Sequence, residues 1–401
     1  MKLVLFCHPP FLSSRSMPLF AQMLRSSFQA KGCDVEMWAP QPKVFKWIPR
    51  RFAKWGGYVD QYLLFPIWVR KALKRTPRDT LFVFCDQALG PWVPLVTNRP
   101  HVVHVHDLLA LRSALGDIPG NPTSLTGRIY QRYIRKGFRQ ARHFISVSNK
   151  TRDDLHRWGQ VAALTSEVVY NGLNFPYAPM NHVEARSVLE SAGLPFSPEG
   201  MLLHVGGGQW YKNLPGVIEL YARYVAQDTH PLPLWCVCPP PSPTIKLALA
   251  KVPGRGSVLF FQNLDSRCLQ AAYSTARAFL FPSLAEGFGW PLVEAQACGC
   301  PVVTTNEPPM NEVAGDSACF LPRMPLAAGL EDWAERGAAV LRQLLARDAS
   351  EKMLCAERGR SWAKRFDSGS AITAYLAIYE KILGGTRIHA IVPRLAQRTK
   401  V

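Results

Sequence analysis

The sequence lacks long apolar runs and any cysteine spacing typical of a metal or redox site. Among its 401 residues no run of about 18 apolar side chains occurs, which excludes a membrane-spanning helix. The apolar start Met1–Phe6 is too short for a signal peptide, and a helical pattern follows it in place of a cleavage site. The pairs Cys236/Cys238 and Cys298/Cys300 fit neither a zinc knuckle nor a Cys-x-x-Cys pair. We therefore expect buried, reduced thiols and a cytoplasmic protein.

Acidic residues are scarce relative to basic ones. The 29 Asp and Glu side chains stand against 47 Lys and Arg, which gives a formal net charge of +18. An excess of this size attracts polyanions, whether nucleic acid, an anionic membrane face or phosphorylated substrates. Charge alone does not choose among these partners, so the choice depends on the motifs and on where the basic residues lie.

The first half of the chain alternates short strands with helical stretches. An apolar run at Lys2–Cys7 is followed by a helix with Pro18 near its start and by a second strand at Val35–Trp38. This is a β-α-β unit, the building block of a parallel sheet. Similar short apolar runs predict further strands at Thr80–Cys85, His101–His106 and Phe144–Ser148.

The second half repeats this plan after a proline-rich, polar linker at Phe175–Gly200. Met201–Val205 reads as a strand, and Pro215 then opens a helix. Because 401 residues exceed one ordinary core, we predict an α/β protein of two domains. The expected divisions are residues 1–175, residues 176–369, a final amphipathic helix at 370–385 that ends at Gly384-Gly385, and a basic tail at 386–401.

A glycine-rich loop follows the first strand of the second half. Gly206, Gly207 and Gly208 let the backbone approach a ligand closely. Lys212 stands just before the next helix, and Asn213 is a candidate cap for it. A lysine beside a helix start suits a phosphate group. Taken alone, the loop is also explained by a tight turn with a surface lysine.

A second loop in the same half carries two glutamates. Glu286 follows the strand that ends at Phe281, and Glu294 lies one turn into the next helix. Gly287, Phe288 and Gly289 stand between them, where backbone N–H groups can hold diphosphate oxygens. A carboxylate at Glu294 can accept hydrogen bonds from both ribose hydroxyls, and one at Glu286 can hold sugar hydroxyls. A capped helix with acidic residues favoured by its dipole explains one glutamate, but not the Gly-Phe-Gly run.

These residues resemble the signature of the retaining glycosyltransferases of family 4, in which seven residues separate the two glutamates. The family has the GT-B fold, in which two Rossmann-like domains with parallel sheets face each other across a cleft. The loop Gly206–Asn213 is similar to the family's diphosphate loop, although Gly207 or Gly208 stands where many members have an arginine. Asn171–Asn174 resembles the turn that ends the first domain, and His106-Asp107 falls where many members carry a histidine facing the donor sugar.

The resemblance implies roles for individual positions. Glu286 would stabilise positive charge at the anomeric carbon, Lys212 would offset charge on the leaving diphosphate, and His106 would contact the sugar or the β-phosphate. As a lone histidine, His106 is also explained as a satisfied residue at a strand end. The other donor-binding residues would be Glu294, Gly207, Gly208, Asn213, Leu264, Gly287, Phe288 and Gly289. The acceptor side would include Ser14, Arg15, Ser16 and Asp107.

The resemblance also bears on cofactors and on the last helix. The sequence has no Asp-x-Asp motif, and the family needs no metal or other cofactor besides its nucleoside diphosphate sugar donor. The final amphipathic helix is expected to cross back to the first domain, as it does in family members.

A basic and aromatic stretch stands out in the first half. Residues 43–78 carry many Lys and Arg interleaved with Trp, Phe and Tyr, and Asp60 is their one acid. This composition favours docking to an anionic membrane face, which would suit a lipid-linked acceptor. The alternatives are ordinary surface helices with aromatic core faces and, less favoured, a site for single-stranded nucleic acid.

We therefore predict a retaining glycosyltransferase that moves a hexose, of mannose or glucose type, from a nucleoside diphosphate sugar. The acceptor would be a glycan or a lipid-linked saccharide, as in bacterial polysaccharide or lipopolysaccharide assembly, at the inner face of the cell membrane and with no nucleic-acid partner. The alternatives are a nucleotide-sugar epimerase or hydrolase of the same fold, and a basic membrane-binding scaffold with an inactive donor site. The base, the sugar and the acceptor are not specified by the sequence.

Overall fold

The computed structural model describes residues 1–12, 16–326 and 328–398, with side chains described as far as Gly384. The chain folds into two compact units. Unit 1 is made of Met1–Asn174 together with the C-terminal segment that begins at Ser368, and unit 2 is Phe175–Asp367.

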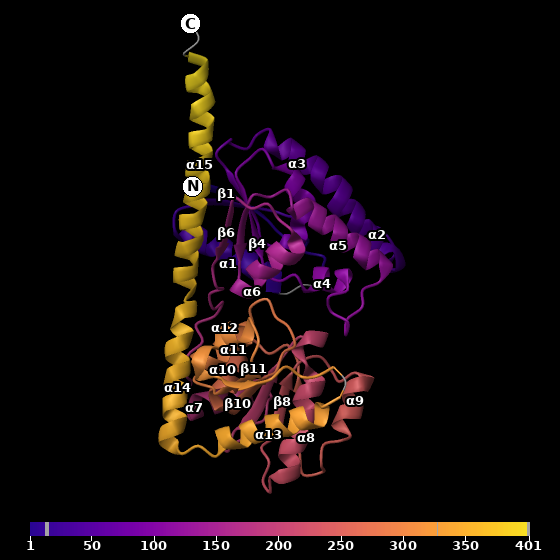
Figure 1. The fold of residues 1–401 in the computed structure, drawn as a ribbon, viewed down its shortest axis with the longest axis vertical. Coiled ribbons are helices and arrows are strands. Elements are labelled where there is room, and N and C mark those ends of the chain that lie inside the picture. Colours follow the sequence, from indigo (N-terminus) through magenta and orange to yellow (C-terminus); the bar gives the residue numbers. More distant parts are fainter. Residues whose placement is uncertain (13–15, 327, 399–401) are drawn as a thin grey trace. The chain divides into compact units, whose positions relative to one another are not determined.

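Unit 1 is a sheet with helices on both faces (Figure 1). Its strands are β1 (Lys2–Phe6), β2 (Asp34–Trp38), β3 (Leu81–Phe84), β4 (His101–Val105), β5 (His143–Ser146) and β6 (Thr165–Val168). Its α-helices are α1 (Ser16–Ala30), α2 (Ala53–Val59), α3 (Phe65–Leu73), α4 (Leu109–Leu115), α5 (Leu125–Phe138), α6 (Asn149–Asp154) and α15 (Ser368–Arg398). Its 3-10 and π segments are η1 (Arg50–Phe52), η2 (Asp60–Leu64), η3 (Gln87–Leu95) and η4 (Leu155–Gly159).

The unit 1 sheet is parallel and buried on both faces. Its strand order is β2-β1-β3-β4-β5-β6, and each neighbouring pair is parallel. Successive side chains of a strand point to opposite faces. Val4 and Phe6 pack with residues of α3, η3 and α5, whereas Leu3 and Leu5 pack with residues of α1 and α15. Strands that are apolar on both faces are typical of a parallel sheet between two helical layers.

Helix α15 belongs to the core of unit 1 and is longer than predicted. Tyr379 packs on the sheet, and its hydroxyl lies 2.7 Å from Nε2 of His104 in β4. The expectation that the helix ends at Gly384-Gly385 is wrong, because the helix continues to Arg398. A glycine destabilises a helix interior by only about 1 kcal/mol relative to alanine. It ends a helix chiefly when it adopts a positive φ, and Gly384 does not.

Unit 2 is a second sheet wrapped by helices. Its strands are β7 (Met201–Val205), β8 (Leu234–Val237), β9 (Val258–Phe261), β10 (Ala276–Phe281), β11 (Val302–Thr305) and β12 (Cys319–Leu321). Its α-helices are α7 (His182–Ser191), α8 (Leu214–Gln227), α9 (Pro243–Leu249), α10 (Ser266–Thr275), α11 (Trp290–Ala297), α12 (Met310–Ala314), α13 (Leu330–Leu345) and α14 (Ala349–Ala363). Its 3-10 segments are η5 (Trp210–Lys212), η6 (Gly315–Ser317) and η7 (Lys364–Phe366).

The unit 2 sheet places β7 and β10 side by side in its middle. The strand order is β12-β11-β10-β7-β8-β9, again with parallel neighbours. One face packs on α8 and α13 through residues such as Leu220, Tyr221 and Trp333. The predicted α/β fold with two parallel sheets is confirmed. Because ligands of open parallel sheets bind beyond the carboxyl ends of the strands, the loops after β7 and β10 hold the predicted site.

Within the described residues, no helix combines the length and the apolar character that a membrane crossing requires.

Candidate active site

The two predicted donor loops of unit 2 are joined to each other. They follow the neighbouring strands β7 and β10, so they leave the sheet at the same edge. The backbone N–H of Leu284 donates to the carbonyl of Tyr211 at 2.7 Å. The side-chain amide of Asn213 donates to the carbonyl of Pro282 at 2.9 Å. These bonds fix the lysine loop and the glutamate loop as one structure.

Lys212 and Glu286 form an ion pair at the centre of this structure. Lys212 Nζ lies 2.8 Å from Glu286 Oε1, and both side chains are largely buried. The Ser283 hydroxyl donates to the same carboxylate oxygen at 2.9 Å. The ammonium also lies 4.8 Å from the centre of the Phe281 ring, within range of a cation–π contact. The resemblance implies separate roles for these two side chains, whereas the structure places them in direct contact.

Glu294 lies in α11 and is only 7% exposed. The hydroxyl of Tyr273, from α10, donates to Glu294 Oε2 at 3.0 Å. Burial raises the pKa of Glu294 to about 7, although the Tyr273 hydroxyl and the charge of Lys212 both favour the carboxylate. The side chain therefore holds a proton over part of the neutral range. Tyr273 and Ser283 are site residues that the sequence prediction missed.

The predicted glycine and asparagine positions have distinct backbone roles. Asn213 has a left-handed φ of 56°, and its side-chain oxygen accepts from the N–H of Gly216 to cap α8. Gly208 and Gly289 have φ of 79° and 96°, values that favour glycine. Gly207 has no such φ. Gly287 and the buried Phe288 lie between Glu286 and α11, and the predicted donor-binding residue Leu264 lies in the loop between β9 and α10.

Three of the five site residues predicted in unit 1, His106, Asp107 and Ser16, lie within the described residues. His106 follows β4, is buried, and lies with Nε2 3.0 Å from the carbonyl of Cys85. Asp107 Oδ1 accepts from the N–H of Leu109 at 3.0 Å, as expected of a turn before a helix. Ser16 is the first residue of α1. Ser14 and Arg15 lie outside the described residues.

A polar pair that the sequence prediction missed lies at the same edge of the unit 1 sheet as His106. His8, after β1, and Asp86, after β3, are 2.8 Å apart at Nε2 and Oδ2. A polar residue directly after each predicted strand was the available signal, because parallel strands end at one edge. In the part of the chain that the structure describes, no group of three His, Cys, Asp or Glu side chains is placed to hold a metal ion.

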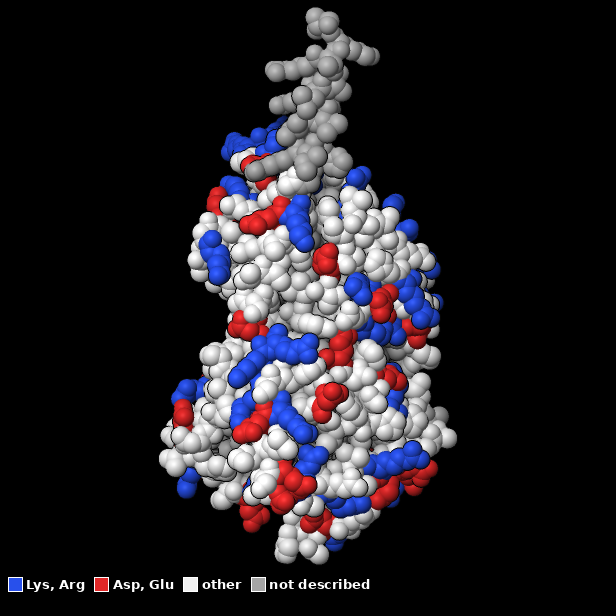
Figure 2. Space-filling view, turned by 60° about the vertical axis from the view of Figure 1, so that its left-hand side comes forward, with Lys and Arg blue, Asp and Glu red and all other residues white. Residues whose placement is uncertain are grey.

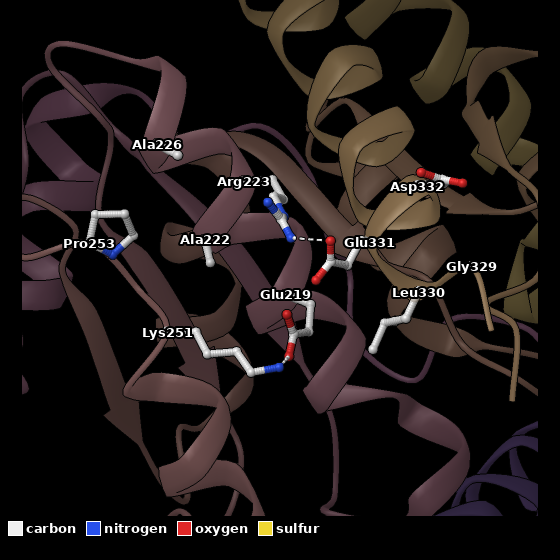
Figure 3. Close-up of a pocket in the computed structure, with 10 residues that line it drawn as sticks. All are labelled: Glu219, Ala222, Arg223, Ala226, Lys251, Pro253, Gly329, Leu330, Glu331 and Asp332. Carbon is white, nitrogen blue, oxygen red and sulfur yellow. Dashed lines mark hydrogen bonds and ion pairs between the residues drawn. The ribbon is translucent and has the colours of Figure 1, made fainter. Parts of the chain in front are cut away.

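A cavity of about 710 Å³ lies elsewhere in unit 2, beside α8 and the start of α13 (Figure 3). Four of the charged side chains that line it form two pairs, Arg223 with Glu331 at 3.3 Å and Lys251 with Glu219. The predicted donor residues are not among those that line it. These pairings neutralise much of the charge in the cavity, and we assign it no part in donor binding.

Two family models match the chain. Residues 19–175 match Glycosyltransferase Family 4, and residues 190–331 match Glycosyl transferases group 1. The chain is 25% identical over 256 residues to the O-antigen chain mannosyltransferase B of Escherichia coli, which covers 63% of this chain and 64% of the relative. It is 24% identical over 230 residues to the O-antigen chain mannosyltransferase RfbU of Salmonella typhimurium. This alignment covers 57% of this chain and 58% of that relative. The match therefore spans less than two thirds of either relative's length.

The fold is similar to that of solved structures over nearly the whole chain. WaaG, described as a glycosyltransferase involved in lipopolysaccharide biosynthesis, superposes with a TM-score of 0.68. The superposition covers 94% of this chain and 99% of WaaG, at 19% sequence identity. At this identity the likeness shows the fold and leaves the substrates open.

Proposed function

Because the chain belongs to glycosyltransferase family 4 and has the GT-B fold, we propose that it transfers a hexose from a nucleoside diphosphate sugar to a saccharide acceptor. The hexose is a mannosyl residue in the first instance, since the curated relatives are O-antigen mannosyltransferases. The acceptor is a growing polysaccharide or lipid-linked saccharide. The anomeric configuration is retained, as the resemblance implies.

The observation that carries this proposal is the Lys212–Glu286 pair with Glu294 on the same loop structure. A cation and a carboxylate held 2.8 Å apart match a sugar diphosphate, in which the phosphates are negative and the reacting carbon becomes positive. Lys212 would move from Glu286 to the phosphates, and Glu286 would then face the sugar. Glu294 would bind the ribose hydroxyls in its ionised form.

Ligand binding followed by transfer tests the proposal. We expect one of GDP, UDP or ADP to raise the thermal unfolding temperature of the parent protein. The same nucleotide should leave the unfolding temperature of Glu294→Ala unchanged. The matching mannose or glucose donor should then release nucleoside diphosphate faster when mannoside acceptors are added. Release that does not depend on any acceptor would favour a hydrolase or epimerase. If no nucleoside diphosphate binds, the alternative that remains is a basic membrane-binding scaffold with an inactive donor site.

We further propose that unit 1 docks on an anionic membrane through residues 43–78 and α5, here called the basic aromatic surface. The one acid of residues 43–78, Asp60, is 1% exposed and accepts from the N–H groups of Val44 and Phe45, both at 2.9 Å. Helix α5 contains no acid and carries Arg128, Arg132, Arg135 and Lys136. No carboxylate of either segment therefore faces outward. On the face shown in Figure 2, by comparison, Lys and Arg lie among Asp and Glu.

Exposed apolar side chains accompany these basic residues. Trp47 is 88% exposed and Trp55 is 65% exposed, which is unusual for such large rings. The two segments form one surface, since Tyr62 of η2 contacts α5: its hydroxyl is 2.6 Å from that of Tyr130, and its ring centre is 5.6 Å from that of Tyr133. Both α3 and α5 lie in the upper part of Figure 1. Amphipathic aromatic rings beside cations are typical of a membrane interface with anionic lipids.

Vesicle flotation tests the docking. We expect the protein to float with vesicles of 30% anionic lipid, and the triple variant of Arg50, Arg51 and Lys54 to Gln to lose most of that binding, because each basic residue contributes about 1 kcal/mol. The control changes Lys246, Arg358 and Lys364 of unit 2 to Gln, with the same loss of charge. Equal flotation of both variants would contradict the proposal.

A further inference from the structure

A cavity of about 570 Å³ lies within unit 1, at the edge of the sheet opposite to the one that carries His106. It is lined by residues at the starts of β4, β5 and β6 and by residues on one side of α15. His101 and His143 are the first residues of β4 and β5, and their ring centres are 6.5 Å apart because parallel strands begin at one edge. A volume of this size is typical of a pocket for a small ligand, which usually has about 300–1,000 Å³.

Three basic side chains from separate segments line the cavity. Arg99 lies before β4, Arg142 lies before β5, and Lys381 lies in α15. Arg142 and Lys381 are exposed, and neither forms an ion pair with any residue that the structure describes. Among the described residues that line the cavity, Glu167 of β6 is the one acid. The cavity therefore has an excess of positive charge, and two of its cations can bind a ligand without first leaving a carboxylate.

Arg99 is the fixed cation of the cavity. The residue is 9% exposed, and its Nη2 donates to the carbonyls of Pro77 and Thr76, the latter at 3.3 Å. Its guanidinium carbon lies 5.2 Å from the centre of the Phe82 ring. The buried Nε has no acceptor within the described part of the chain, so the protein itself does not satisfy all the donors of this side chain. A guanidinium that is already held in place loses little conformational freedom when it binds an anion.

The two histidines of the cavity are neutral near pH 7. Nδ1 of His101 lies 2.8 Å from the carbonyl of Arg99, and because a carbonyl only accepts, Nδ1 carries the proton. Burial lowers the pKa of His101. Burial also lowers the pKa of His143 to about 4, and His101 and the charge of Arg142 act in the same direction. The positive charge of the cavity therefore comes from Arg and Lys, which keep it throughout the neutral pH range.

A phosphate monoester fits these side chains better than a carboxylate does. Its phosphate is close to a dianion at neutral pH and has three acceptor oxygens that point in different directions. Guanidinium groups bind phosphate oxygens through two parallel N–H donors, and a lysine adds a point charge. A carboxylate carries one charge in one plane, so it would leave part of the positive charge unmatched. Leu164 and Ile378 also line the cavity and offer an apolar contact for the carbon part of such a ligand.

We propose that this cavity binds a phosphate monoester through Arg99, Arg142 and Lys381. A sugar phosphate and the headgroup of a lipid phosphate both carry this group. Glu167 opposes binding, because its carboxylate repels a dianion. The residues that line the cavity belong to unit 1, so the site is distinct from the donor loops of unit 2 and does not depend on the proposed transferase function.

Calorimetry of the full-length protein at constant ionic strength tests the site. The probes are inorganic phosphate, a hexose 6-phosphate and dihexanoyl phosphatidate below its micelle concentration. Arg142→Gln combined with Lys381→Gln should weaken the binding of these probes at least about tenfold, because two charge-assisted contacts are lost. Tighter binding of the hexose phosphate would assign a sugar phosphate to the site, and tighter binding of the phosphatidate would assign a lipid headgroup.

The matched control changes Arg70 and Lys71 of α3 to Gln. Both are exposed residues of unit 1, so the loss of charge is the same. This variant should bind the probes as tightly as the parent, and an equal weakening of both double variants would overturn the proposal. Glu167→Gln should tighten binding about twofold or more, the effect expected of one exposed charge, and a damaged fold would not produce such a gain. Unchanged binding in Glu167→Gln would contradict the proposal.

Imidazole NMR locates the bound phosphate. The His143 ring resonances should shift as inorganic phosphate is added, whereas those of His230, an exposed histidine of unit 2, should stay in place. Burial lowers the pKa of His204 and the charge of Lys212 adds to this effect, so the His204 ring reports on the donor loops. Shifts of His204 without shifts of His143 would place the anion at the donor loops and overturn the proposal. Absence of binding to the parent at millimolar phosphate would overturn it as well.

Discussion

Both sheets are parallel and six-stranded, but the side chains at the carboxyl ends of their strands differ. In unit 2 the carboxyl edge holds a preformed ion pair, Lys212–Glu286, and a buried carboxyl, Glu294. In unit 1 it holds two histidines and the carboxylate of Asp86, whose Oδ2 lies 2.8 Å from His8 Nε2 and whose pKa, despite its burial, lies below its ordinary value because of the His8 hydrogen bond. Fixed opposite charges suit a polar ligand such as a sugar diphosphate. We therefore expect the donor to bind at the unit 2 edge, where the charged side chains match its diphosphate.

The largest effect should follow from breaking the unit 2 ion pair. We expect Glu286→Ala and Lys212→Ala each to lower kcat by about 10³-fold, as removal of a group that stabilises transition-state charge does. The double variant should lose about the product of the two single effects, because Lys212 acts on the phosphates and Glu286 acts on the sugar once the donor is bound. Initial rates of nucleoside diphosphate release measure this.

Ser283→Ala is the matched control for the ion pair. It removes the hydroxyl that donates to the same Glu286 oxygen but leaves both charges in place. We expect a loss of less than about tenfold, since a neutral hydrogen bond contributes about 1 kcal/mol. A double variant of Glu286 and Lys212 that is no slower than either single one would show that the two side chains act as one unit and not on separate parts of the donor.

Local patterns predicted the fold well because the apolar and polar pattern of neighbouring residues determines each strand and helix. Short apolar runs marked the strands, and Pro215 and Pro291 marked helix starts. The end of α15 was mispredicted because glycine is a weak stop signal in a helix that packs on a sheet. The candidate site residues stay predictions, since their roles depend on a ligand.

The sequence motifs did not indicate hydrogen-bond partners that lie far apart in the sequence. Glu294 was found from its spacing to Glu286, but its hydrogen-bond donor Tyr273 lies in another helix and belongs to no motif. His8 and Asp86 are 78 residues apart, and only the pairing of β1 with β3 makes them neighbours. Strand order and register are decided by the packing of the whole sheet, which spacing along the chain does not report.

A second prediction separates binding from stability at Glu294. Its pKa of about 7 lies above the ordinary 4.5, so the folded state keeps a proton that the unfolded chain has lost. Stability from this group is present below about pH 4.5 and is lost as the pH rises through 7. Glu294→Gln should therefore stabilise the protein at pH 8 by up to about 3 kcal/mol and have little effect at pH 5.

The same variant should bind donor poorly. The neutral amide cannot make charge-assisted bonds with ribose hydroxyls, so we expect nucleoside diphosphate affinity to fall about 10- to 100-fold. Calorimetry at pH 8 and thermal unfolding at both pH values check the two arms. Destabilisation at pH 8 would show that the buried carboxylate is well satisfied in the fold, and unchanged affinity would remove Glu294 from the donor site.

A third prediction tests whether unit 1 leaves donor binding untouched. His106 Nδ1 is buried, and the described residues provide no hydrogen-bond partner for it. We expect His106→Gln to lower the transfer rate about tenfold through loss of one sugar contact, worth about 1.4 kcal/mol. Nucleoside diphosphate affinity, measured by calorimetry, should not change. A loss of nucleotide affinity equal to that of Glu294→Gln would show that His106 contributes to nucleotide binding as much as Glu294 does.

The smallest effects should come from the glycine loop of unit 2, where two neighbouring glycines differ. Gly208 has a φ of 79°, so Gly208→Ala should cost about 1 kcal/mol of stability. The three atoms nearest to a Cβ at Gly207 belong to the amide end of Gln209, a flexible side chain that can move. Gly207→Ala should leave the unfolding temperature unchanged and weaken nucleotide binding a few-fold if phosphates lie against this backbone. Unchanged affinity in Gly207→Ala would leave Lys212, and not the loop backbone, as the phosphate ligand.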